Sequence, residues 1–198
     1  MENETSETKF GWFIVIGTLP IVILGFLFQD LIRTELRSLW VVAIVLILGG
    51  IILGLADRLG RQSLQLRNVD LRSGVIAGFA QALALVPGVS RSAATISAMR
   101  ALGYDRVAAL QFSFLLAIPA VLASGIFELV NSLSNPELSR FSAAQTLVAT
   151  SVSFISGYIV IAWLLRYVTR RSFVPFVIYR ISLGALLIIL LSSGTIVA

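Results

Sequence analysis

The strongest constraint on this sequence is that its apolar residues come in long runs with almost no charge. Residues 10–28 contain no Asp, Glu, Lys or Arg. A helix of that length measures about 28 Å, close to the thickness of a bilayer core. Four more runs have the same character, at residues 39–56, 106–127, 141–165 and 175–197, the last interrupted near its start by Arg180. The sequence therefore predicts an all-α integral membrane protein with about five transmembrane helices.

The composition supports the membrane class and excludes several kinds of site. Hydrophobic residues make up 58% of the 198 and charged residues 13%, whereas soluble domains carry about 25% charged residues. The chain has no cysteine and no histidine, which excludes disulfides, thiolate metal sites and any side chain that ordinarily titrates near neutrality. The net charge of +5 lies mainly at the ends of apolar runs, which favours membrane lipids over nucleic acid as the partner.

Residues 71–102 do not fit a single span. Both halves are apolar, but the sequence Pro-Gly-Val-Ser-Arg-Ser at 87–92 interrupts them. A helix over 74–86 is about 20 Å long, which is too short to cross a bilayer. We therefore expect a re-entrant helix hairpin whose tip is buried in protein or faces a watery cavity. We expect residues 1–9 to form a polar loop segment and residues 10–198 to form one membrane domain.

The distribution of positive charge orients this arrangement. If the hairpin returns to its own side, about ten basic residues share the side of the N-terminus. They are Lys9, Arg58, Arg61, Arg67, Arg72, Arg100, Arg106, Arg166, Arg170 and Arg171. Arg33, Arg37 and Arg140 lie on the other side. Because cytoplasmic loops are enriched in Lys and Arg, the N-terminal side is predicted to be cytoplasmic and the C-terminus to face outward.

The hairpin tip has the chemistry of an anion site. Ser90 and Ser92 stand where the second short helix begins, so their hydroxyls and the free backbone N–H groups there favour an anion. Arg91 adds a guanidinium that binds phosphate through two donors, and Thr95 lies one helical turn after Ser92. In the alternative interpretation, Arg91 extends to the membrane surface, the serines only cap the helix and Thr95 donates to its own helix.

Three other features of the sequence each have a structural and a functional interpretation. Gln81 precedes the tip and either contacts a ligand or packs inside the hairpin, the second being favoured. For Arg180, near a predicted membrane interface, we expect the side chain to extend to the surface. Gly74 and Gly78 are spaced four apart, which indicates close helix packing.

Four stretches of the chain carry a recognisable pattern, namely GFAQALALVPGVSRSAATI at 78–96, GTLP at 17–20, FSFLLAIP at 112–119 and FVPFVIYR at 173–180. Together they resemble bacterial undecaprenyl-diphosphate phosphatases of the bacitracin-resistance type. The resemblance implies a hydrolase of the bacterial plasma membrane that recycles the cell-wall lipid carrier, built from inverted repeats and using Mg²⁺ or Ca²⁺. It also implies Arg91 and Ser90 as catalytic residues, with Gly88, Ser92, Thr95 and Gln81 binding undecaprenyl diphosphate.

The sequence departs from that family in two ways. Ala93 replaces the usual glycine, which is a handicap if the position needs positive φ and harmless if it is helical. The family's first signature, with paired glutamates, a serine and a histidine, is absent. We therefore expect an incomplete chain that supplies only the Ser-Arg-Ser half of the site and no metal ligand, with the missing half coming from an upstream reading frame or another chain. The expected partners are this N-terminal half or, in a homo-oligomer, further copies of the chain. The alternatives are a non-catalytic remnant that binds lipid diphosphate and a lipid transporter or flippase.

Overall fold

The computed structural model describes residues 2–28, 38–134 and 141–196. Within these ranges the chain is helical, with connecting turns and one isolated bridge between Leu64 and Tyr104. In chain order the helices are α1 (Glu2–Leu27), α3 (Leu39–Leu59), η2 (Leu66–Asn68), α4 (Leu71–Ala82), η3 (Leu83–Leu85), α5 (Arg91–Ala101), α6 (Arg106–Ser134), α7 (Ala143–Val168) and α8 (Val174–Ser192).

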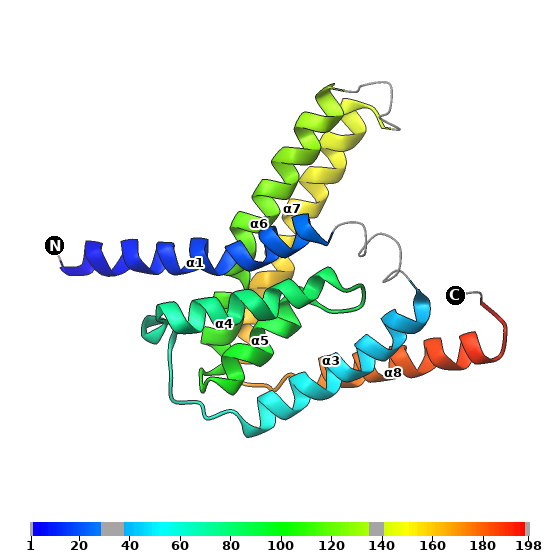
Figure 1. Cartoon of the computed structure of the whole chain (residues 1–198), viewed down its shortest axis with the longest axis horizontal. Coiled ribbons are helices and arrows are strands. Elements are labelled where there is room, and N and C mark those ends of the chain that lie inside the picture. The colour runs from blue at the N-terminus through cyan, green and yellow to red at the C-terminus, as the bar shows by residue number, and fades with distance from the viewer. Residues whose placement is uncertain (1, 29–37, 135–140, 197–198) are drawn as a thin grey trace.

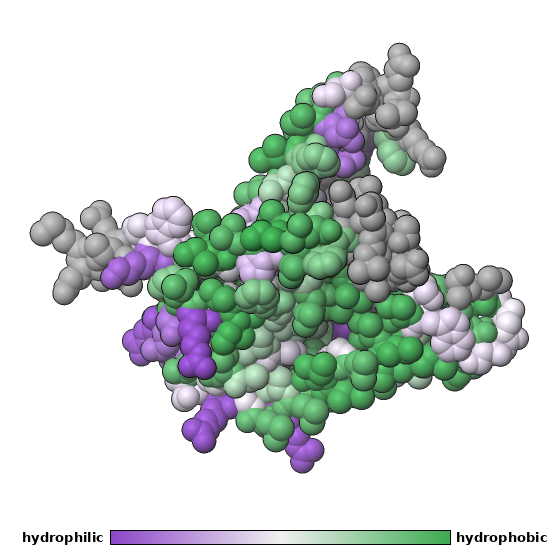
Figure 2. All heavy atoms as spheres, viewed as in Figure 1, coloured by the Kyte–Doolittle hydropathy of each residue, from purple (hydrophilic) through white to green (hydrophobic). Residues whose placement is uncertain are grey.

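Five of these helices are long and apolar enough to cross a membrane, namely α1, α3, α6, α7 and α8. Their outward side chains are mostly hydrophobic, and Figure 2 shows such residues over most of one face of the molecule. An apolar surface of this extent would be unfavourable in water, whereas the lipid tails of a membrane solvate it. The prediction of an all-α integral membrane protein with five spanning helices is confirmed.

The N-terminal segment differs from the expected loop. Helix α1 begins at Glu2, so the polar residues before Phe10 continue the apolar helix. Glutamate is a good helix former and is favoured in the first turns, where the helix dipole is positive. Arg33, Arg37 and Arg140, which were assigned to the outer side, lie outside the described residues.

The hairpin predicted over 71–102 consists of two short helices side by side (Figure 1). The side chain of Asp70 caps the start of α4, and the side chain of Ser90 caps the start of α5. Between the helices Gly88 has a φ of +93°, a conformation that L-residues other than glycine avoid. As α-helices, α4 and α5 measure about 18 and 16 Å, so neither spans a bilayer.

Two helix pairs hold this hairpin in place. α4 lies along α1, where a Cβ at Gly17 would stand 2.7 Å from the carbonyl oxygen of Gly74. α8 lies along α3, where a Cβ at Gly184 would stand 2.7 Å from the carbonyl oxygen of Ala43. α6 and α7 extend away from these pairs (Figure 1). The small residues allow the backbones to approach closely, as in other membrane helix interfaces.

The C-terminal end of α5 is tied to its neighbours by a buried ionic cluster. The side chain of Arg100 is 0% exposed, and its guanidinium donates to the carbonyl oxygens of Tyr104, Asp57 and Gly60. Asp57, 5% exposed, accepts from Arg106 and from the backbone N–H of Phe173. The cluster therefore joins the ends of α3 and α5 to the starts of α6 and α8.

Candidate functional site

The site begins at the N-terminus of α5. Ser90 is its N-cap, and its Oγ accepts from the backbone N–H of Ala93 at 3.3 Å. The Oγ atoms of Ser90 and Ser92 are 3.2 Å apart. The preceding turn closes with a bond from Val89 N–H to Val86 O at 3.1 Å. The first turn of α5 thus combines two hydroxyls with the positive end of a helix dipole, as the sequence predicts.

Arg180 of α8 lies at the same tip. It is 7% exposed, and its Nη2 donates to the carbonyl oxygen of Gly88 at 3.1 Å. The prediction that Arg180 extends to the membrane surface is therefore wrong. The physical reason is that α3 presents Gly49 opposite the guanidinium, where a Cβ would stand 2.5 Å from Nη2. The absent side chain leaves space for Arg180 to lie inward between α3, α5 and α8.

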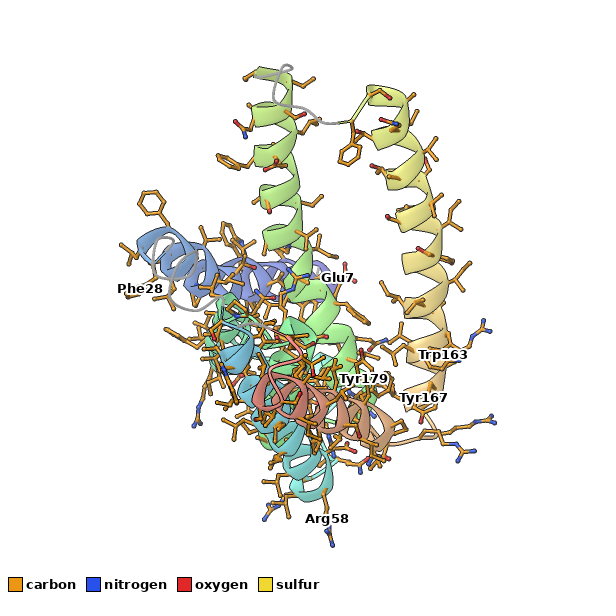
Figure 3. The ribbon with its side chains drawn as sticks, turned by 90° about the vertical axis from the view of Figure 1, so that its right-hand side faces the viewer. Glu7, Phe28, Arg58, Trp163, Tyr167 and Tyr179 are labelled. Atoms are coloured by element: carbon orange, nitrogen blue, oxygen red, sulfur yellow. The ribbon has the colours of Figure 1, made fainter. Side chains whose placement is uncertain are left out.

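Two cavities open from the tip, and Ser90, Ala93 and Arg180 line both. The first, of about 320 Å³, lies between α3, α5, α6, α7 and α8. Its other walls are Leu46, Leu53, Ser92, Ile96, Leu110, Leu164, Phe173, Phe176 and Tyr179. Of these residues, Tyr179 belongs to α8. Figure 3 shows Trp163 and Tyr167 on α7, and the ring centroids of these two residues are 5.3 Å apart.

The second cavity, of about 390 Å³, lies between α3, the end of α4 and α5. Its walls are almost entirely apolar, and they include Gly49, Ile52, Leu83, Val89 and Ala94. Each cavity is thus apolar along its length and polar where Ser90 and Arg180 lie. This combination suits an amphiphile with an anionic head and a hydrocarbon chain.

Arg91, the residue on which the predicted site centres, is the first residue of α5 and is partly exposed. Its side chain does not line either of these two cavities. Within the described part of the chain, no hydrogen bond or ion pair occupies its guanidinium. Its five N–H donors are therefore available to an anion at the start of α5.

Two other predicted residues lie behind the tip. Thr95 is 0% exposed, and its hydroxyl donates to the carbonyl oxygen of Arg91 at 2.9 Å. This bond within its own helix matches the alternative interpretation of Thr95. Gln81 is also 0% exposed, and neither its Nε2 nor its Oε1 has a hydrogen-bond partner. Neither side chain lines the two cavities, whereas the backbone of Gly88 belongs to the tip.

The residues that the structure describes do not fit a divalent cation. Among the described side chains, no three from His, Cys, Asp or Glu lie together. The buried carboxylate of Asp57 is already paired with Arg106. Mg²⁺ and Ca²⁺ require several oxygen ligands, and those available here do not converge.

The model of the bacitracin resistance protein BacA family matches residues 1–186. The chain belongs to this family. The undecaprenyl-diphosphatase of Clavibacter michiganensis subsp. michiganensis is 54% identical over 198 residues, which is 100% of this chain and 72% of the relative. That of Nocardioides sp. is 50% identical over 192 residues, 97% of this chain and 69% of the relative. The family resemblance is confirmed, and BacA relatives of this kind are hydrolases by name.

Arg180 lies at the tip beside Ser90, contrary to the prediction from the sequence. Two signals were available: Arg180 ends the quoted stretch FVPFVIYR, and α3 carries the adjacent glycines Gly49 and Gly50. Neither signal shows that these segments meet, because Arg180 and Gly88 are separated by 92 residues in the chain.

Proposed function

We propose that this chain binds undecaprenyl diphosphate and supplies part of the site that hydrolyses it to undecaprenyl phosphate and phosphate. The observation that carries the proposal is the tip itself. The N-terminus of α5, with its two serines, lies beside the buried Arg180 of α8, and two largely apolar cavities begin there. The names of the BacA relatives support the identity of the substrate.

In this proposal the chain's residues bind charge. The diphosphate lies at the start of α5, where Arg91 and the backbone N–H groups of the first turn contact its oxygens. Ser90 and Ser92 donate hydroxyl hydrogen bonds. During hydrolysis a water oxygen bonds to the terminal phosphorus while the bond from that phosphorus to the bridging oxygen breaks. Fixed donors stabilise the negative charge that develops on the oxygens.

Activation of the water is assigned to groups outside this chain. Hydrolysis needs a base and usually a divalent ion. The chain has no histidine, and its described carboxylates form no cluster at the tip. A missing N-terminal half, or another chain that carries it, would then provide the base and the ligands for Mg²⁺ or Ca²⁺. This division of roles agrees with a chain that carries the Ser-Arg-Ser signature but not the signature with paired glutamates and a histidine.

We also propose the bacterial plasma membrane as the location, with the N-terminal side cytoplasmic and the C-terminus outward. The support is the distribution of Arg and Lys along the sequence. Exposed arginines on the N-terminal side include Arg58, Arg61, Arg67 and Arg72, and Figure 3 shows Arg58 at the end of α3, pointing away from the helices.

The test is phosphate release from undecaprenyl diphosphate by membranes that contain this chain. It is run with and without Mg²⁺, and with and without a co-expressed N-terminal half from a relative. We expect release only with the added half, and loss of that release in Arg91→Ala. Arg171→Ala, at an exposed arginine between α7 and α8, is the control and should retain activity. Release by the chain alone would contradict the assignment of the base to another chain.

A second function, lipid-diphosphate binding without turnover, is favoured by one observation. The described residues provide an anion site without a neighbouring base or metal cluster. Binding of the lipid diphosphate without phosphate release in either setting would support it. A flippase would require the tip to become accessible from both faces, which labelling of a cysteine introduced at Ser92 would detect. The chain's lack of natural cysteine keeps that experiment free of background.

A further inference from the structure

The guanidinium of Arg180 is buried without a negatively charged partner. Its Nη2 donates to the Gly88 carbonyl, and its Nε is buried without a hydrogen-bond partner. No Asp or Glu of the described residues forms an ion pair with it. A buried cation is strongly unfavourable unless it meets an opposite charge or enough acceptors. In a membrane protein such a residue indicates a functional site.

This guanidinium lies beside the start of α5. Arg180 and Ser90 line both cavities. Arg180 also holds the carbonyl oxygen of Gly88, two residues before the N-cap. An anion that accepts from the first turn of α5 would therefore lie beside a second, buried source of positive charge.

The packing of α3 against α8 is shaped around this side chain. At Gly49, a Cβ would stand 2.5 Å from Nη2 and 3.4 Å from Cζ of Arg180. At Gly50, a Cβ would stand 3.3 Å from Cβ of Arg180. Real Cβ atoms do not approach other atoms at 2.5 Å. Any side chain at position 49 therefore displaces the guanidinium.

We propose that Arg180 is a second anion-binding residue of the diphosphate site, and that Gly49 holds it in place by leaving room for its guanidinium. The proposal rests on the function proposed above. It assigns two cations to the ligand. Arg91 comes from the first turn of α5, and Arg180 from the C-terminal helix. Through Gly88, Arg180 also positions the turn that leads into α5.

The experiment measures binding of farnesyl diphosphate to the full chain in lipid nanodiscs. Hydrogen bonds between charged groups predict a loss of about tenfold to a hundredfold in affinity for Arg180→Gln. Arg180→Lys should recover only part of it, because an ammonium lacks the bidentate geometry. For Arg180→Ala, millimolar guanidinium chloride should restore binding. A residue with a structural role alone would not give this rescue.

The second part of the experiment changes Gly49, which lies against the guanidinium of Arg180. Gly49→Ala should weaken binding as Arg180→Gln does. Gly54→Ala on the same helix, where a Cβ would stand an ordinary 3.4 Å from Val177, should leave binding unchanged. In the Arg180→Gln background, Gly49→Ala should add little, since residues that act through one contact are not additive.

The outcomes separate the two proposals. If the wild-type chain does not bind farnesyl diphosphate, the function proposed above fails and this inference fails with it. If the wild type binds and folded Arg180→Gln binds equally well, only the inference is overturned. If Gly49→Ala lowers the affinity by the same factor in the wild type and in Arg180→Gln, the role assigned to Gly49 is overturned. The thermal unfolding midpoint of each variant shows whether it is folded.

Discussion

Arg106 and Asp57 form a two-point ion pair that joins α6 to α3. Nε of Arg106 lies 2.7 Å from Oδ1 of Asp57, and Nη2 lies 3.2 Å from Oδ2. Nε of Arg100 lies 3.3 Å from the same Oδ1. One carboxylate therefore faces two arginines, of which Arg100 is fully buried and Arg106 is 24% exposed.

Replacing Asp57 with asparagine should destabilise the fold strongly. The variant leaves Arg100 buried without a negative charge, and removing one partner of a buried pair costs about 3–5 kcal/mol. The measurement is the free energy of unfolding of the chain in detergent, followed by helical circular dichroism.

Arg106→Gln is the matched control for this cluster. It removes a partly exposed arginine and leaves Asp57 paired with Arg100, so the expected loss is about 1 kcal/mol. If both variants lose the same stability, the buried charge of Arg100 does not determine the effect.

The sequence predicts the helices of this fold more completely than their contacts. Uncharged runs and the Pro-Gly break are local properties of the chain, so the five long helices and the hairpin follow from them. Ser90 as an N-cap follows from its position before a helix. The contact between Arg180 and Gly88 depends on how α3, α5 and α8 pack, and that information is absent from residue spacing.

The same distinction holds for the polar residues of the hairpin. Arg91, Ser90 and Ser92 are adjacent in sequence, so their grouping is predictable. Whether Thr95 faces a ligand or its own helix depends on how α5 is rotated against its neighbours. In the structure Thr95 is buried, and its hydroxyl donates to the carbonyl oxygen of Arg91 in its own helix.

Gly78→Ala should disrupt the packing of α4 on α1. A Cβ at this position would overlap the carbonyl oxygen of Gly17, which belongs to rigid helix backbone. Overpacking of this kind costs about 1–3 kcal/mol, measured as a loss in the free energy of unfolding. Gly125→Ala in α6, where nothing lies within 4 Å, should be neutral or slightly stabilising. Equal effects of the two variants would contradict the role of Gly78 in packing.

Ala93→Gly, which restores the usual residue of the family, should lower stability. Ala93 lies inside α5, and no non-glycine residue in the described ranges has positive φ. Glycine in a helix interior costs about 0.5–1 kcal/mol relative to alanine. The same variant should not improve binding of farnesyl diphosphate by more than about twofold, since the backbone is already helical there. A tenfold tighter complex would show that the first turn of α5 rearranges around the ligand.

Asp70 should make stability depend on pH in the acid range. Its Oδ1 accepts from the backbone N–H of Ser73 at 2.8 Å and from Ser73 Oγ at 2.6 Å. These bonds lower the pKa of Asp70 below its ordinary value. The unfolded chain therefore holds this proton more tightly than the folded one. The contribution is complete above the unfolded pKa of about 4 and is lost as pH falls through the folded pKa.

The measurement compares the free energy of unfolding of the wild type and Asp70→Asn at several pH values. Asparagine also caps a helix, so it keeps the capping geometry and removes the titration. Because Asp70 is exposed, the wild type should be more stable by only about 0.5–1 kcal/mol at pH 6. That advantage should shrink steadily as the pH falls below about 4. A difference that stays constant from pH 6 to strongly acidic solution would mean that the carboxylate is not held by Ser73 in the folded protein.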